Sequence, residues 1–309
     1  MTSAMPDLTQ HTAVVTGATG GMGQVIAATL INAGAHVVTI ARDPARADIL
    51  RARVGKDLEH RLDIIPGDLS RREDLCAAAQ TIEDRYEQIH ILVNNAGAHF
   101  PDHRLSPDGI EMHIALDYLA AYGLMTSLDA PLRRGRARIV NVASDTLNDT
   151  RRIKLAGEPR PPTLDLTDVY DLADLNPRTG FVPFEAYARA KLMTVTAGYA
   201  LTRSFTPDGV TLNAVHPGIV ATDIIDDLVP RPLRPFGALI RRTMLTPADG
   251  ARTALRIATD PELAGVTGRY FNQGSIAVTP PISHDPAVQR KLLALSEAHF
   301  ARPGSSCGL

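Results

Sequence analysis

The sequence has little that would cross-link the chain, anchor it in a membrane or give it a large net charge. Its 309 residues include two cysteines, Cys76 and Cys307, in no metal-ligand spacing, which argues against a disulfide framework or a metal site and suits a reducing compartment. The 32 Lys and Arg residues nearly balance the 34 Asp and Glu residues, so no global field would recruit nucleic acid or an anionic membrane. Residues 1–10 lack a signal-peptide run, and nowhere do about 18 apolar residues follow one another. We therefore expect a cytoplasmic protein whose partner is a small molecule.

Short apolar runs alternate with longer segments of helical period along most of the chain. The runs are rich in β-branched residues, which is typical of a parallel sheet covered on both faces. About seven strands are predicted, at residues 13–16, 36–40, 63–65, 89–93, 138–142, 211–215 and 269–271. Helices are predicted at residues 24–32, 71–86, 111–128, 186–203 and 247–258. The pattern predicts a single α/β domain over residues 1–309, with helices on both faces of a doubly wound sheet.

Three stretches interrupt this alternation. Residues 145–183 and 223–246 are rich in proline, and long irregular segments inside a compact domain usually form lids or binding loops. We interpret the first stretch as an insertion or flap and the second as a substrate loop. Residues 280–309 form a C-terminal extension with one helical stretch at 287–299, and we expect its end to be frayed.

A glycine-rich loop follows the first predicted strand and leads directly into a helix. Backbone N–H groups and a helix N-terminus can then face a pyrophosphate, and glycine lets the phosphate approach the backbone. This context predicts a Rossmann-type dinucleotide site at Gly17, Thr19, Gly20, Gly21, Met22 and Gly23. The spacing fits both Gly-x3-Gly-x-Gly and Gly-x2-Gly-x2-Gly, and a plain tight turn is the alternative.

The end of the second strand indicates which dinucleotide binds. An acid at this place accepts hydrogen bonds from a free ribose 2′-hydroxyl, whereas an arginine suits a 2′-phosphate. Here Ala41 takes the place of the acid and Arg42 follows it. We therefore expect NADP(H) rather than NAD(H) as the cofactor. The alternative is a solvated Arg42 that pairs with Asp43 or Asp48.

Tyr187 and Lys191 lie four residues apart at the start of a predicted helix, which places the phenol and the ammonium on one face. A tyrosine that moves protons at neutral pH needs its pKa lowered from about 10, and a neighbouring ammonium acts in that direction. A Tyr-x3-Lys pair alone is more often part of a surface helix with a snorkelling lysine. The catalytic interpretation therefore depends on other motifs.

Further motifs follow predicted strands, at the sheet edge where open α/β sheets bind ligands. They are the glycine loop at residues 17–23, Asn94-Asn95-Ala96-Gly97, Val142-Ala143-Ser144 and the stretch from His216 to Thr222. With Tyr187 and Lys191, they make residues 13–271 resemble the short-chain dehydrogenase/reductase family, in its shorter single-domain branch. Residues 108–113 and 246–270 resemble its retinol-dehydrogenase-like group. That group's membrane anchor is not seen here, so retinoid substrates are not implied.

The resemblance implies roles for individual residues. Tyr187 would be the general acid or base, Ser144 would hydrogen-bond the substrate oxygen, and Lys191 would hold the nicotinamide ribose and tune Tyr187. Asp68 and Leu69 would flank the adenine, Asn95, Ala96 and Gly97 the adjacent ribose, and Pro217, Gly218, Val220 and Thr222 the nicotinamide carboxamide. The implied reaction is NADPH-dependent reduction of a ketone or aldehyde, or oxidation of the alcohol. Family members commonly associate through their long helices, so a homo-oligomer is expected.

Two departures from the family pattern bear on these expectations. Asp117 stands where the family usually has an asparagine, which completes a catalytic tetrad through a water bound to the lysine. Because the backbone carbonyl largely holds that water, an aspartate can still serve; the alternatives are an altered proton relay or lost redox activity. A long segment separates Ser144 from Tyr187, and it must loop out before the two side chains can meet.

Other features leave alternatives open. His99 and Asp145 either touch substrate or are solvated loop residues, and His113 and His216 are assigned no chemistry. Residues 229–248 contain arginines and no acid, which fits a carboxylated or phenolic substrate, although ordinary solvated arginines explain them better. Two other functions stay open: a non-redox lyase, isomerase or cyclase that keeps a bound nicotinamide cofactor, and a cofactor-sensing binding protein.

Overall fold

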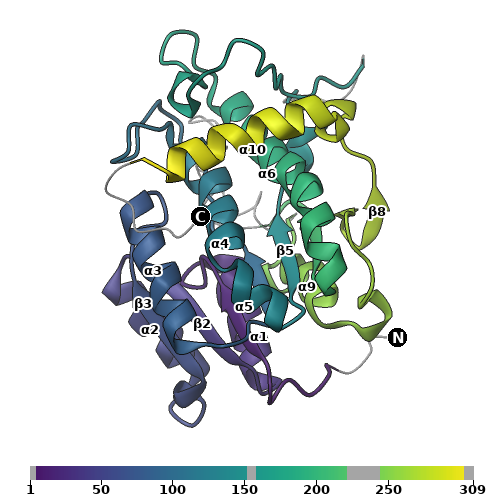
Figure 1. Ribbon diagram of the computed structural model, residues 1–309. Coiled ribbons are helices and arrows are strands. Elements are labelled where there is room, and N and C mark those ends of the chain that lie inside the picture. The colour runs from purple at the N-terminus through teal and green to yellow at the C-terminus, as the bar shows by residue number, and fades with distance from the viewer. Residues whose placement is uncertain (1–4, 152–157, 221–243, 303–309) are drawn as a thin grey trace.

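A central sheet organises the chain. The computed structural model describes residues 5–151, 158–220 and 244–302. Over these residues the sheet has eight strands in the order β3-β2-β1-β4-β5-β6-β7-β8 (Figure 1). Paired strands from β1 to β7 are parallel, and β8 is antiparallel to β7. The strands are β1 Thr12–Val15, β2 His36–Ala41, β3 Leu62–Pro66, β4 Ile91–Asn94, β5 Arg138–Val142, β6 Thr211–His216, β7 Tyr270–Asn272 and β8 Ser275–Ala277.

This sheet confirms the predicted Rossmann-type doubly wound α/β fold. The strand order reverses between β1 and β4, which are neighbours in the sheet although two strands separate them in the chain. In open α/β sheets, ligands bind outside the carboxyl ends of the strands at such a switch point. The glycine loop follows β1 and the Asn94–Gly97 motif follows β4, so the fold brings both motifs to this place.

The eighth strand escapes sequence prediction because it carries no apolar pattern of useful length. It has three residues, of which Ser275 and Ile276 are exposed, and a two-residue turn joins it to β7. Gln273 and Gly274 in that turn have φ angles of 47° and 96°. Hairpin turns of this kind need such left-handed residues, and glutamine is rarely one of them. The turn therefore has only a weak sequence signal.

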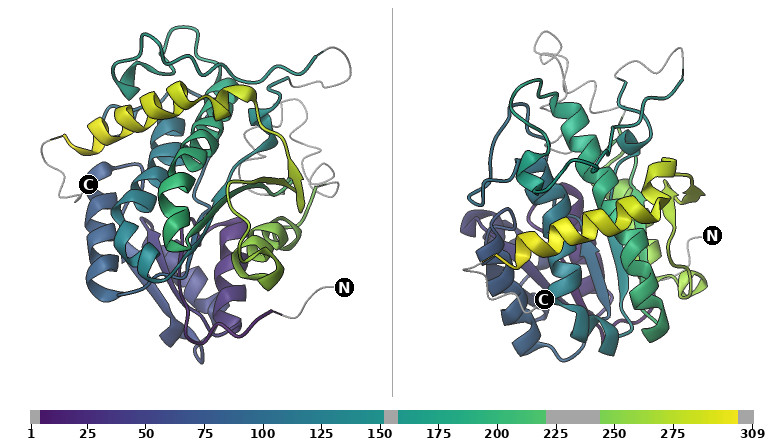
Figure 2. Two further views of the ribbon diagram at one scale, coloured as in Figure 1. Left: turned by 45° about the vertical axis from the view of Figure 1, so that its right-hand side comes forward. Right: turned by 45° about the horizontal axis from the view of Figure 1, so that its top comes forward.

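Helices cover both faces of the sheet (Figure 2). On one face, α1 (Gly21–Asn32) and α9 (Pro247–Thr259) share an apolar core with β1. On the other face, α3 (Arg72–Arg85), α4 (Ala120–Ser127) and α6 (Pro183–Phe205) share a second core. All five predicted helices are present.

Three helical details differ from the prediction. The helix predicted at 111–128 begins as a π-helical turn, η2 (Ile114–Leu119), and continues as α4. Two further helices were not predicted: α2 (Pro44–Val54), which buries only Ala47 and Leu50, and α5 (Asp129–Arg134), which has six residues. A narrow apolar stripe and a short length both weaken the helical period on which sequence prediction depends.

The segment between β5 and α6 packs onto the core of the sheet. Its buried leucines, Leu164, Leu166, Leu172 and Leu175, belong to the same apolar cluster as α3, α4 and α6. Arg189 of α6 donates from Nε to the backbone oxygen of Thr163 at 2.7 Å. In Figure 1 this segment passes over the top of the molecule, beyond α10. Residues 158–182 thus form an ordered cover whose leucines extend the main core.

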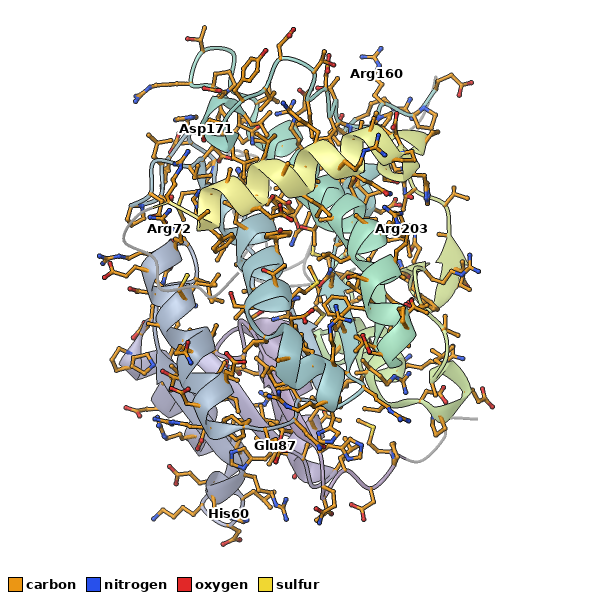
Figure 3. All side chains as sticks on the ribbon, in the orientation of Figure 1. His60, Arg72, Glu87, Arg160, Asp171 and Arg203 are labelled. Atoms are coloured by element: carbon orange, nitrogen blue, oxygen red, sulfur yellow. The ribbon has the colours of Figure 1, made fainter. Side chains whose placement is uncertain are left out.

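The C-terminal extension carries α10 (Pro286–Phe300), which crosses the outer side of α4 and α6 (Figure 1). Tyr118 of η2 and Ser296 hydrogen-bond through their hydroxyls at 2.5 Å, and Phe300 packs against Gly123 of α4. The end of α10 is also held: Arg72 Nη1 donates to the His299 oxygen at 2.7 Å, and Asp171 pairs with Arg302. Figure 3 labels Arg72 and Asp171 on either side of this helix end.

Two expectations drawn from composition can be compared with the structure. Cys76, buried on α3, is disulfide-bonded, so the expectation of a chain without disulfides is wrong. Two cysteines that are distant in sequence give no spacing from which a bond can be inferred, and Cys307 lies outside the described residues. Among the described helices, none combines the length and the apolar run needed to cross a bilayer.

The contact between α4 and α10 makes a prediction about stability. A Cβ atom on Gly123 would lie 2.5 Å from Cζ of Phe300 and 2.9 Å from Cδ2 of Leu75. Gly123→Ala should therefore lower the free energy of unfolding by about 1–3 kcal/mol, as overpacking does in a dense core. Urea unfolding measures this loss. Gly265→Ala is the control, because nothing lies within 4 Å of its added methyl group; equal unfolding midpoints for the two variants would contradict the packing argument.

Candidate active site

The glycine loop between β1 and α1 has the conformation of a phosphate-binding turn. Gly17 and Gly21 have φ angles of 64° and 26°. A Cβ atom on Gly23 would lie 2.1 Å from the backbone oxygen of Gly17, whereas nothing lies within 4 Å of one on Gly20. Backbone constraints thus fall on Gly17, Gly21 and Gly23. The Gly-x3-Gly-x-Gly spacing is therefore the one that the fold requires.

The loop ends at a helix terminus that can receive an anion. Gly20 is the N-cap of α1 and supplies no side-chain cap, and the first turn holds no acidic residue. The N–H groups and dipole of such a terminus favour a negative ligand. Thr19 accepts from Gln24 Nε2 through its backbone oxygen at 2.9 Å, and Met22 is buried beside Gly250. Thr19 and Met22 therefore shape this turn.

Thr16 and Asn95 tie the glycine loop to the turn after β4. The Thr16 hydroxyl accepts from the backbone N–H groups of Asn95 and Ala96, each at 2.9 Å. In return, Asn95 Nδ2 donates to the backbone oxygens of Thr16 at 3.0 Å and Gly17 at 3.4 Å. The Asn95 side chain is thus engaged in holding the loop.

At the adenosine end, Arg42 and Asp68 lie together. Arg42, directly after β2, has 68% of its side chain exposed and places Nη1 3.7 Å from Asp68 Oδ2. Asp43 instead caps α2 by accepting from the Ala45 N–H at 2.9 Å, and Asp48 pairs with Arg51. The arginine predicted to meet a 2′-phosphate therefore neighbours the aspartate predicted to flank the adenine, and Leu69 beside it is buried.

Tyr187, Ser144 and Lys191 come together as predicted. Tyr187 and Lys191 project from the first turns of α6, which begins at Pro183, a residue whose fixed φ suits a helix start. Ser144, which follows β5, lies close enough to the Tyr187 hydroxyl to lower the pKa of the phenol. Lys191 Nζ lies 5.6 Å from the centroid of the Tyr187 ring. Tyr187 is 8% exposed and Lys191 3% exposed, so both functional groups lie in the interior.

The ionisation of Tyr187 differs from the expectation. Burial raises the pKa of Tyr187, Lys191 lowers it, Asp117 raises it and the hydrogen bond with Ser144 lowers it, so that the net pKa lies above the ordinary value. The lysine acts in the expected direction. The lowering of the Tyr187 pKa by Lys191 is outweighed because the phenol is buried and a carboxylate lies beside the ammonium.

Asp117 contacts Lys191 directly through its side chain. Its Oδ1 lies 3.0 Å from Lys191 Nζ and accepts from the Ala98 N–H at 3.1 Å. Its backbone oxygen accepts from the Thr194 hydroxyl at 2.8 Å. From the sequence, we expect the backbone carbonyl at this position to hold the water that binds the lysine. In the structure the carboxylate itself reaches the lysine, because the π-helical turn η2 faces Lys191 and Gly97 between them has no side chain.

A second buried network was not foreseen. Glu111, 1% exposed, accepts from His113 Nδ1 at 2.8 Å and from Asn176 Nδ2 at 2.9 Å. Arg189 donates to the Asn176 side-chain oxygen. The His113 ring lies 6.0 Å from that of Tyr187. The network therefore joins the segment before α6 to α6 itself. Its only sequence signal is a Glu-Met-His stretch that predicts no contact with distant residues.

The remaining candidates take defined places. The His99 ring lies 6.0 Å from the Tyr187 ring, whereas Asp145 accepts from Asn148 Nδ2 at 3.0 Å. Pro217 and Gly218 follow β6, and Gly218 needs its φ of 91°. Val220 pairs with Leu245 and packs on Gly250. Thr222 and most of the substrate loop, including its arginines, lie outside the described residues.

Comparisons with known proteins agree with this arrangement. Residues 11–152 match the family model described as short chain dehydrogenase. Human retinol dehydrogenase 14 is 30% identical over 93% of this chain and 85% of that protein. Mouse polyprenol dehydrogenase is 31% identical over 94% of this chain and 84% of that protein. The chain belongs to the short-chain dehydrogenase/reductase family. Within it, these similarities place the chain in the retinol-dehydrogenase-like group.

Solved structures share the fold. An uncharacterized protein from Mycobacterium paratuberculosis superposes with a TM-score of 0.70 at 23% identity, over 96% of both chains. Pseudomonas aeruginosa RhlG, solved as an NADP active-site complex, has a TM-score of 0.63 at 22% identity, over 86% of this chain and 95% of that one. This short-chain dehydrogenase therefore has the architecture of its family.

The glycine geometry makes a prediction for this dehydrogenase. Gly23→Ala should lower the midpoint of thermal unfolding without nucleotide, because the added methyl group collides with the backbone oxygen of Gly17. Overpacking of this kind costs about 1–3 kcal/mol. Gly20→Ala should unfold close to the wild type, since its methyl group meets open space. Similar losses in both variants would mean that the assigned spacing is wrong.

Proposed function

We propose that the chain is an NADP(H)-dependent oxidoreductase that reduces a ketone or aldehyde, or oxidises the corresponding alcohol, with Tyr187 as general acid or base. The observation that carries this proposal is the meeting of Tyr187, Ser144 and the Lys191 ammonium in the interior of the protein. Membership of an oxidoreductase family, with relatives named as dehydrogenases, supports redox chemistry over the lyase, isomerase or cyclase alternative.

The described residues fit a nicotinamide dinucleotide. A loop whose Gly17 and Gly23 leave no room for side chains precedes an uncapped, acid-free helix terminus, which suits a pyrophosphate. Lys191 has three N–H donors; among the described residues, two of them meet Asp117 and the Val142 oxygen at 3.0 and 3.1 Å. The third is available for a ribose hydroxyl.

NADP(H) is the proposed form of this dinucleotide. Arg42 is largely exposed, and its contact with Asp68 is long enough to be exchanged for a phosphate. A guanidinium binds phosphate through two parallel hydrogen bonds, which a free hydroxyl cannot match. Ala41, the last residue of β2, offers no carboxylate to repel the 2′-phosphate.

In the reducing direction each side chain has one task. Ser144 donates to the substrate carbonyl oxygen and polarises it, while Tyr187 gives its phenolic proton to the same oxygen. A bound reduced nicotinamide would supply the hydride to the carbonyl carbon. The Lys191 ammonium stabilises the Tyr187 phenolate that remains, and the phenolate regains a proton from solvent. In the oxidising direction the phenolate removes the alcohol proton.

The substrate class is proposed from the surroundings of Tyr187. The rings of His99 and His113 lie edge-on to it, each at 6.0 Å, and Phe181 stacks on His113 at 6.2 Å. These rings, and relatives named for retinol and polyprenol, support an apolar alcohol or its carbonyl compound as substrate.

Self-association through the long helices stays a prediction. Because α10 already lies across α4 and α6, a second copy that bound these helices would have to share their outer face with α10.

Tyr187→Phe tests the proposed acid. The variant lacks the transferable proton, so turnover should fall by at least about a hundredfold, while NADPH binding stays close to the wild type. Consumption of NADPH with an aldehyde substrate and quenching of protein-bound NADPH fluorescence measure the two properties. Tyr199→Phe, on the same helix with its hydroxyl on Thr279 at 3.2 Å, should keep full activity. Full activity of Tyr187→Phe would refute the mechanism.

Arg42→Ala tests the cofactor preference. Loss of a charge-assisted contact with the 2′-phosphate costs about 1.5–3 kcal/mol, so kcat/KM with NADPH should fall about ten- to a hundredfold while that with NADH barely changes. Arg51→Ala, which removes a cation of α2 that pairs with Asp48 and Glu59, should affect both cofactors little. Equal losses with both cofactors in Arg42→Ala would rule out 2′-phosphate recognition.

A further inference from the structure

A fully buried ion pair stands behind the catalytic tyrosine. Lys191 Nζ and Asp117 Oδ1 are 3.0 Å apart, with side-chain exposures of 4% and 0%. Buried charges of this kind are costly unless geometry and hydrogen bonds compensate them, and a carboxylate adds a full negative charge where a neutral amide would serve as an acceptor equally well. The charge itself therefore calls for a function.

The surroundings hold the carboxylate in place against the ammonium. The Ala98 N–H donates to the same Oδ1 at 3.1 Å, and a Cβ atom on Gly97 would lie 2.4 Å from it. Asp117 Oδ2 is buried and has no hydrogen-bond partner among the described residues. The negative charge is thus directed at Lys191, and no competing cation lies within ion-pair distance in the described part of the chain.

The pair faces Tyr187 as a near-neutral unit. An ammonium alone would favour phenolate, and the carboxylate 3.0 Å from it acts in the opposite direction and offsets part of that field. Among the described residues, the titratable and polar groups around Tyr187 are Lys191 on α6, Asp117 on η2, His99 after β4, His113 before η2, Ser144 after β5 and Tyr270 on β7. His113 Nε2 accepts from the Phe100 N–H at 3.0 Å.

We infer that Asp117 is a positioning residue whose carboxylate neutralises Lys191 and so keeps the Tyr187 proton on the phenol oxygen through neutral pH. The inference rests on the proposed function of this site. It gives the aspartate a task that an asparagine cannot perform. The site holds its acid ready for proton donation to a carbonyl oxygen over a wider alkaline range than the Lys191 charge alone would allow.

Asp117→Asn separates the charge from the hydrogen bond. The amide oxygen can still accept from Lys191 and the Ala98 N–H, but the ammonium is no longer neutralised. The pKa of Tyr187 then falls, because the remaining positive charge favours phenolate. Reduction requires the phenol, so its alkaline decline in kcat/KM moves to lower pH. Oxidation requires the phenolate, so its acid-side rise moves to lower pH as well.

A titration independent of turnover accompanies the kinetics. The near-ultraviolet absorbance of phenolate is followed with pH in the wild type and in Asp117→Asn, each against its own Tyr187→Phe counterpart, so that the difference isolates Tyr187. Glu111→Gln is the matched control, since it removes a buried carboxylate that pairs with His113 and Asn176 and not with Lys191. Circular dichroism shows that each variant is folded.

The expected result is a shift of the Tyr187 titration and of both kinetic profiles to lower pH in Asp117→Asn, with Glu111→Gln titrating like the wild type. An unshifted titration in folded Asp117→Asn, or an equal shift in Glu111→Gln, overturns the inference. The titration outcomes do not depend on the proposed reaction. If Tyr187→Phe were fully active, the proposed function would fail while the titration still decided the role of Asp117.

Discussion

The rest of the site depends on the contacts of the Lys191 ammonium. It is buried, and it binds the Val142 oxygen at the end of β5 and the Asp117 carboxylate of η2. Breaking such a buried pair by removing one partner costs about 3–5 kcal/mol, because an uncompensated charge remains. The same contact therefore joins α6 to β5 and η2 and fixes the place of Tyr187. Stability of the fold and the position of Tyr187 have a common origin here.

Glycine residues allow neighbouring segments to approach closely at both ends of the site. Gly97 lets Asp117 approach Lys191, and Gly17 lets the loop after β1 pack on Ala96 of the next turn. Thr16 and Asn95 then fasten the two turns with four hydrogen bonds. The residues that sequence reasoning assigns to a bound dinucleotide thus serve first to hold one loop against another. A rigid edge of the sheet prepares the space that a dinucleotide would occupy.

Sequence alone predicted the parallel sheet, its five main helices and the meeting of Ser144, Tyr187 and Lys191, because periodicity and motif position are local signals. It could not predict that Asp117 reaches Lys191 with its side chain, since a π-helical turn sets that direction. The network of Glu111 with Asn176 was not predicted either, because it joins residues that are far apart in sequence. The exposed β8, the polar α2 and the disulfide of Cys76 lack a pattern that sequence reasoning can use.

The central claim is that this edge of the sheet directs a hydride to a carbonyl carbon while Tyr187 protonates the oxygen. The most direct measurement uses NADPH deuterated at the reactive carbon of its nicotinamide, an apolar aldehyde and mass spectrometry of the alcohol formed. The account predicts one deuterium on the carbinol carbon of the product. A product formed by the enzyme without deuterium would contradict it.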